Sequence, residues 1–121
     1  MIGYATIGSN DLEKAKSFYD TVLAPLGGKR AFASDRMQGY AGGGGAMLAV
    51  CAPYDGGAAQ PGNGNMVALA APSAEVIKQV YDLALEHGGA DEGAPGERSP
   101  TFYGAYFRDL DGNQVCVFKA G

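Results

Sequence analysis

Few side chains in this sequence offer catalytic chemistry. There is one histidine, His87, and the two cysteines are Cys51 and Cys116. A reactive cysteine needs a base or a positive charge beside it. For Cys116 only Arg98 or Arg108 could supply that charge, through a tertiary contact, so we predict an inert thiol. His87 ends a helical pattern, where the helix dipole favours a cation, and we predict a surface residue rather than a catalytic group or metal ligand.

The other polar residues that could take part in binding or catalysis each have a structural and a functional interpretation. Arg98 lies in a glycine- and proline-rich segment, residues 93–100, and is either a solvated loop residue or a ligand for a carboxylate or phosphate. Asp109 and Asp111 are spaced like paired catalytic carboxylates, but they border a turn and are predicted to accept its backbone hydrogen bonds. The run Gly42–Gly45 lacks the lysine and the following helix of a phosphate-binding loop.

A repeat of about 60 residues indicates which elements position these side chains. The run YDTVLAPLGG, Tyr19–Gly28, is answered by YDLALEHGG, Tyr81–Gly89. Hydrophobic periodicity and turn residues predict two helices, starting at 9–11 and 72–75, and strands over 1–7, 29–33, 37–41, 46–52, 65–71, 103–108 and 114–119. Ser9 or Asn10 is expected to cap the first helix and Ser73 the second. Segment 93–100 is predicted to be a loop with at most a short strand.

The predicted fold class is α+β. Two tandem βαβββ modules are expected to form a curved, incompletely closed eight-stranded mixed sheet, with a helix on the outer face of each module. Residues 1–121 make one domain, with module one over about 1–53, a linker over about 54–64 and module two over about 65–121. A ligand cavity can form between two such modules.

Composition excludes several classes of partner. The net charge is −4 and no basic cluster is present, which argues against nucleic acid. No apolar run approaches the roughly 20 residues of a membrane span. The first residues have no secretory signal pattern, so a cytoplasmic location is expected. In that compartment Cys51 and Cys116 are predicted to be buried free thiols rather than a disulfide.

Four motifs carry a resemblance to a known family: SNDLEKAKSFYDTVLAPLG (9–27), GNGNMVALAA (62–71), GAPGER (93–98) and FRDLDGNQVCVF (107–118). Together with the doubled module they resemble the vicinal oxygen chelate superfamily. That superfamily includes glyoxalase I, bleomycin-resistance proteins, fosfomycin-resistance proteins and extradiol dioxygenases. The chain is most similar to its small bacterial glyoxalase-like members.

The resemblance also implies where a metal would bind. Metal-dependent members place His and Glu or Gln on the first and last strands of each module. Here those positions hold Tyr4, Val50 to within a residue or two (Leu48 being an alternative), Met66 or its neighbour Asn65, and Cys116. A phenol, an aliphatic group, a thioether and a thiol do not suit the divalent ions of this family. We therefore predict no metal and no cofactor.

The family geometry would turn Tyr4, Met66 and Cys116 into the cavity between the modules. Strand alternation would then send Cys51, Val115 and Val117 to the opposite face, under the helices. The complete set of cavity candidates is Tyr4, Val50, Met66, Cys116, Tyr40, Tyr103 and Arg98. The tyrosines either donate hydrogen bonds to a ligand or pack on the strands, and these side chains either line an open cavity or fill it.

Three functions follow from this sequence. The first is binding of a small organic molecule between the modules by a member that has lost the family metal ligands. The second is an enzyme, a glyoxalase-type lyase or a relative, which would need two titratable groups facing the cavity. The third is a structural or interaction protein with a filled cavity. The resemblance further implies a homodimer, since exposed strand edges favour pairing.

Overall fold

A computed structural model describes the whole chain, residues 1–121, as two helices and two four-stranded sheets. Module one contains β1 (Tyr4–Gly8), α1 (Leu12–Val22), the 3-10 turn η1 (Ala24–Leu26), β2 (Lys29–Ser34), β3 (Met37–Ala41) and β4 (Met47–Cys51). Module two contains β5 (Val67–Ala70), α2 (Ala74–Glu86), β6 (Ala90–Ser99), β7 (Phe102–Arg108) and β8 (Gln114–Ala120). The predicted α+β class and the doubled βαβββ order are confirmed.

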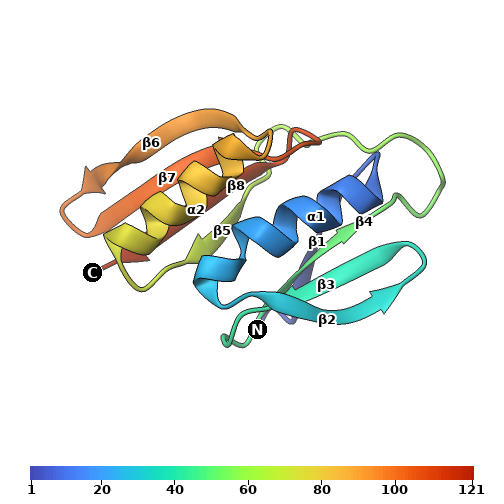
Figure 1. Ribbon diagram of the computed structural model, residues 1–121, viewed down its shortest axis with the longest axis horizontal. Coiled ribbons are helices and arrows are strands. Elements are labelled where there is room, and N and C mark those ends of the chain that lie inside the picture. The colour runs from blue at the N-terminus through green and yellow to red at the C-terminus, as the bar shows by residue number, and fades with distance from the viewer.

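The two sheets have the same topology. Their strand orders are β1-β4-β3-β2 and β5-β8-β7-β6, and in each sheet the first and last strands of the module pair in parallel. The helices lie side by side over one side of both sheets, and β2 and β6 form the outer edges (Figure 1). Neither helix is long and apolar enough to cross a membrane.

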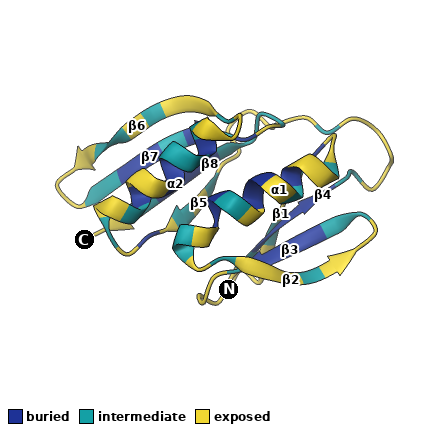
Figure 2. Ribbon diagram, viewed as in Figure 1, coloured by how far each residue is buried: buried dark blue, intermediate teal, exposed yellow.

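The core lies between the helices and the sheet faces beneath them. Each helix has four buried residues, and the buried residues of the sheets lie in the central strands β3, β4, β7 and β8 (Figure 2). Phe18 of α1 packs on Phe107 of β7, with ring centroids 6.4 Å apart, so the first helix contacts the second module. The core is therefore shared by both modules. We call the sheet side turned away from the helices the open face.

The helix caps correct one prediction and confirm another. Asp11, rather than Ser9 or Asn10, caps α1, and its Oδ1 accepts from the Lys14 amide at 3.2 Å. The Asn10 side chain is engaged elsewhere, because it exchanges two hydrogen bonds with the backbone of Ala59 in the linker. Ser73 caps α2 as predicted and accepts from the Val76 amide at 3.2 Å.

Segment 93–100 was expected to be a loop, and this expectation is wrong. Residues 93–99 belong to β6, a strand of 10 residues that pairs with β7, and only Pro100 lies in the following turn. The register shifts at three places along that pairing. Bulges at these places interrupt the regular alternation of side chains between the two sheet faces, by which a strand is recognised in a sequence. Gly93, with φ of 155°, lies at one of them.

The turn between β7 and β8 joins the two modules. Asp109 is only 5% exposed, and its Oδ1 accepts from the amides of Asp111 and Asn113, both at 2.9 Å. This confirms that the carboxylate serves the turn. Its Oδ2 also accepts from the Tyr19 hydroxyl of α1 at 2.6 Å. The Asn113 side chain donates to the carbonyl of Gly8 at 2.8 Å, which adds a second link to module one.

Burial raises the pKa of the Tyr19 hydroxyl well above its usual value, and the Asp109 charge adds to this effect. The phenol is therefore protonated at all ordinary pH values and donates to the carboxylate. Hydrogen bonds to charged groups are stronger than neutral ones. This bond is thus a strong intramolecular link across the module boundary.

The repeat supplies a matched pair of variants that tests this link. Tyr19→Phe leaves the buried Asp109 carboxylate short of a donor, and we expect the free energy of unfolding to fall by about 1.5–3 kcal/mol. Tyr81 is its counterpart in α2, and its hydroxyl bonds Asp91, a surface carboxylate that water can reach. Tyr81→Phe should cost about 1 kcal/mol or less. Equal losses in urea denaturation would contradict the proposed role of Asp109.

Candidate functional site

A pocket of about 540 Å³ lies between the two modules. Of its 18 lining residues 14 are hydrophobic. Module one contributes Leu23 and Leu26 near η1 and the glycine loop between β3 and β4, and module two contributes β5 with the preceding Met66. The pocket therefore exists only because the two modules are held side by side.

Local sequence explains the wall that η1 forms. Pro25 is the second residue of the 3-10 turn after α1, and Gly27, with φ of 76°, closes the turn in a left-handed conformation. At Gly28 a Cβ would stand 2.6 Å from the Cβ of Leu23, so only glycine lets the chain pass so close. This sharp return presents Leu23 and Leu26 to the pocket.

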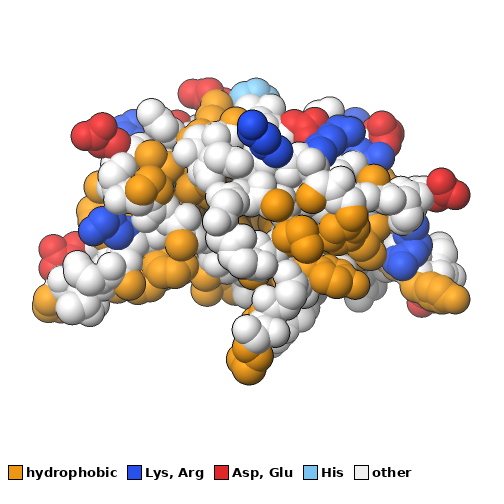
Figure 3. Space-filling model, turned by 90° about the horizontal axis from the view of Figure 1, so that it is seen from below, with side chains coloured by type: hydrophobic (Ala, Val, Ile, Leu, Met, Phe, Trp, Pro, Cys, Tyr) orange, Lys and Arg blue, Asp and Glu red, His pale blue; other side chains and the backbone are white.

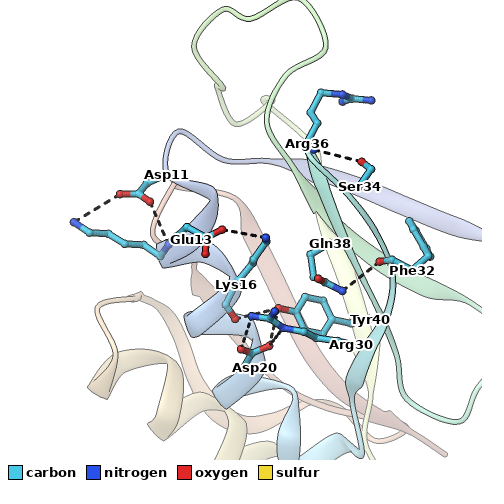
Figure 4. Close-up of polar contacts among 11 residues, drawn as sticks. Asp11, Glu13, Lys16, Asp20, Arg30, Phe32, Ser34, Arg36, Gln38 and Tyr40 are labelled. Atoms are coloured by element: carbon cyan, nitrogen blue, oxygen red, sulfur yellow. Dashed lines mark hydrogen bonds and ion pairs between the residues drawn. The ribbon is translucent and has the colours of Figure 1, made fainter.

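No charged side chain lines the pocket, and its only hydrogen-bonding side-chain group is the Tyr40 hydroxyl. That hydroxyl is already committed, because it lies 3.0 Å from both the Lys16 carbonyl and Asp20 Oδ1 (Figure 4). Burial, followed by the bond to Asp20, raises the pKa of Tyr40 far above its usual value. The pocket thus offers an apolar surface without a free acid or base.

Two of the residues predicted from sequence line this pocket, Met66 and Tyr40. Tyr4 lies on the open face instead, where its ring packs edge-on against Phe32 at 5.4 Å between centroids. Tyr103 packs against the hydrophobic core. Cys116 and Arg98 belong to the second sheet, away from the pocket lining. The structure therefore does not bring the predicted set together in one cavity.

The strand pairing moves the position assigned to Val50 by one residue, which is within the residue or two that the repeat left open. In the parallel pairs Thr6 lies beside Ala49, and the equivalent Ala68 lies beside Cys116. The counterpart of Cys116 is therefore Ala49, and neither Val50 nor Leu48, both of which belong to the helix-covered core. A slip of one residue exchanges the two faces of a strand.

The same slip corrects the prediction for Cys51. It was expected under the helices, but it follows Val50 and is absent from the helix-covered core, so it lies on the open face. Val115 and Val117 do lie in the core as expected. Both cysteines are buried free thiols, as predicted.

Cys116 is fully buried on the second sheet, opposite Tyr106. Burial raises the pKa of its thiol, while the Tyr106 hydroxyl and the Arg98 charge act in the opposite direction. The net direction favours the neutral thiol over the nucleophilic thiolate.

The donor set does not fit the metal that the family resemblance implies. With the register corrected, the four positions are Tyr4, Ala49, Met66 and Cys116, which supply no imidazole and no carboxylate. The chain has no group of three or more His, Cys, Asp or Glu residues that could hold a metal ion. His87 is the C-cap of α2, with its Nδ1 2.9 Å from the Leu83 carbonyl.

Sequence reasoning missed most of the pocket. Leu26 and Leu69 were readable only as members of apolar runs, since nothing in their spacing distinguishes a pocket wall from the core. The Gly42–Gly45 run was a usable signal, because four small residues beside a hairpin leave space that larger side chains would fill.

A family model described as Glyoxalase/Bleomycin resistance protein/Dioxygenase superfamily matches residues 1–117. Among solved structures, a glyoxalase/bleomycin resistance protein from Albidiferax ferrireducens is 33% identical, with a TM-score of 0.91 and 98% of each chain covered. A hypothetical protein from S. aureus is 25% identical, with a TM-score of 0.75 and coverage of 99% of this chain and 93% of that one. No functionally curated protein matches the chain.

A third solved structure shares the fold at lower identity. It is a glyoxalase/bleomycin resistance protein/dioxygenase family enzyme from Burkholderia phytofirmans, 16% identical, with a TM-score of 0.79 and 98% of each chain covered. At that identity the likeness concerns the fold alone.

The ion pair between Asp20 and Arg30, beside Tyr40, should make the stability of the protein depend on pH. Hydrogen bonds from Arg30, both at 2.9 Å, hold the pKa of Asp20 below its ordinary value of 3.8. The ionised form therefore contributes stability that is present above pH 3.8 and is lost as pH falls through the lower folded value. Asp20→Asn should be less stable than the parent at neutral pH, and the gap should close with acidification.

The matched control is Asp82→Asn, at the equivalent position in α2. Asp82 pairs with Lys78 on an exposed helix surface, where such pairs contribute about 0.3–0.5 kcal/mol. Urea denaturation across the acidic range measures both variants. A gap for Asp20→Asn that does not change with pH would mean that the ion pair does not stabilise the fold.

Proposed function

Because the chain belongs to the glyoxalase/bleomycin resistance protein/dioxygenase superfamily, we propose that it binds a small organic molecule in the pocket between its modules. The volume of about 540 Å³ supports this proposal, since ligand pockets are typically about 300–1,000 Å³. The observation that carries it is the lining: an open space between modules with 14 hydrophobic residues out of 18. The expected ligand is uncharged and largely apolar.

Binding accounts for these residues better than turnover does. A general acid or base must reach the proton that it transfers. The pocket supplies only the Tyr40 hydroxyl, which Asp20 and a backbone carbonyl already occupy. A glyoxalase-type lyase activity is therefore the weaker proposal for this chain.

Two further proposals concern the oligomeric state of the protein and its location in the cell. Tyr4 and Met66 are 53% and 46% exposed, unusual for large apolar side chains, and a second copy of the chain could cover them. The strands β2 and β6 form the outer edges of the two sheets (Figure 1), so each has a free edge for pairing. A homodimer and a cytoplasmic location remain predictions.

Indole is a suitable probe for the pocket, being neutral, aromatic and fluorescent. The chain has no tryptophan, so indole emission can be followed without protein background when the excitation wavelength is one that its seven tyrosines do not absorb. We expect the emission of indole to move to shorter wavelength on titration with protein, because its surroundings change from water to hydrocarbon. An unchanged spectrum at saturating protein would refute an open apolar pocket.

A pair of variants tests whether indole binds in this pocket. Ala5 lines the pocket, and Ala5→Leu adds volume there, so we expect indole affinity to fall about tenfold or more. Ala58→Leu adds the same side chain on the exposed linker, outside the pocket, and should leave binding unchanged. If both variants bind indole like the parent protein, the site lies elsewhere.

A further inference from the structure

Arg98 is a cation without a partner on the open face of the second sheet. No carboxylate lies within 4.0 Å of its guanidinium, whereas five other basic side chains form ion pairs. Its carbon Cζ lies 5.4 Å from the ring centroid of Tyr106, and its Nη2 donates to the Ala94 carbonyl at 2.6 Å. The guanidinium is thus held in place by an aromatic ring and a carbonyl, and its charge is not neutralised.

The bulged course of β6 builds this position. A Cβ on Gly93 would stand 3.2 Å from Nη2 of Arg98, and one on Gly96 would stand 2.9 Å from Nη1. The two glycines therefore make room for the guanidinium as it folds back over its own strand. Both glycines and Arg98 belong to the motif GAPGER, residues 93–98.

The surrounding surface is aromatic and carries no free acid. Tyr106 shares a face of β7 with Phe102, whose ring stacks on Phe118 of β8 at 5.2 Å. The acids earlier in β6 are engaged, because Asp91 accepts from the Tyr81 hydroxyl and Glu92 pairs with Arg108. Glu97, next to Arg98, forms no ion pair with it.

The β2 side of the molecule, which Figure 3 shows, is rich in apolar atoms below the helices. Figure 3 shows the one histidine, in the α2 cap, at the upper edge, so the helices lie along that edge with most of the charged side chains. Hydrophobic side chains gather across the middle and lower part of this view. On the second sheet, an anion with an apolar body would match the Arg98 cation and the nearby aromatic rings of Tyr106, Phe102 and Phe118.

We propose that Arg98 anchors the carboxylate of a small aromatic acid on the open face of the second sheet. One of the five N–H donors of the guanidinium is used by Ala94, so a planar carboxylate can still be bound by two of the others. The aromatic body of the ligand would rest on the Tyr106 side of this face.

This site is separate from the pocket of the proposed function. Arg98 belongs to β6, and β5, which lines the pocket, is three strands away in the order β5-β8-β7-β6. At 4.7–4.9 Å per strand that separation is about 14 Å. Neither site needs the other to be occupied.

Benzoate, benzamide and acetate separate the contributions of charge and ring. In NMR titrations of the full chain, we expect benzoate to shift the Nε–H signal of Arg98 and the amides of residues 93–98. Benzamide keeps the ring without the charge and acetate keeps the charge without the ring, so both should bind more weakly. Benzamide binding as tightly as benzoate would overturn the carboxylate assignment. Inorganic phosphate binding more tightly than benzoate would overturn it too.

Arg98→Gln should lower benzoate affinity at least about tenfold, because charged hydrogen bonds are lost. Arg36→Gln is the matched control, since Arg36 also lies over a tyrosine, 5.2 Å from the Tyr54 ring centroid, and donates to the Ala52 carbonyl. Equal losses in both variants would indicate nonspecific cation binding and refute the site. Indole binding should be the same in Arg98→Gln as in the parent chain, so failure of either proposal can be recognised without the other.

Discussion

The carboxylate of Asp109 is the group on which this structure depends most. A buried charge is costly unless hydrogen bonds replace its lost water. Here Asp109 receives the Tyr19 hydroxyl from α1 together with two amides and the Asn113 side chain from its own turn. Satisfying one carboxylate therefore fixes a turn of module two against a helix of module one. The pocket between the modules exists because this joint holds them side by side.

The repeat made the fold predictable. Two matching helix ends, a turn at Asp111–Asn113 and an N-cap at Ser73 are local signals, and each corresponds to an element that the structure contains. The prediction of the residue that caps α1 failed, because several neighbouring residues were suitable caps. Three polar residues precede α1, and tertiary bonds to the linker, which a sequence does not display, decide that Asn10 is not the cap.

The candidate site was harder to predict, for a physical reason. Strand faces alternate with every residue, so placing Val50 opposite Cys116 required a register that only the pairing of β1 with β4 establishes. Met66 could be named from its place in the repeat and Tyr40 from its hydroxyl, whereas Leu26 and Leu69 carry no such signal. The position of Arg98 depends on bulges in β6, which interrupt the pattern that would reveal a strand. What the sequence does show is that Tyr4, Ala49, Met66 and Cys116, the positions that the family resemblance implies for metal ligands, supply no imidazole and no carboxylate.

The most direct test of the central claim, an open apolar pocket between the modules, is methyl NMR of the protein titrated with indole. The account predicts that the methyl signals of Leu26, Leu69 and Met66 shift together with a single dissociation constant, since all three line the pocket. The methyls of Leu110, outside this pocket, should not move. Shifts confined to Leu110 and its surroundings, or no shift at all in the three pocket residues, would contradict it.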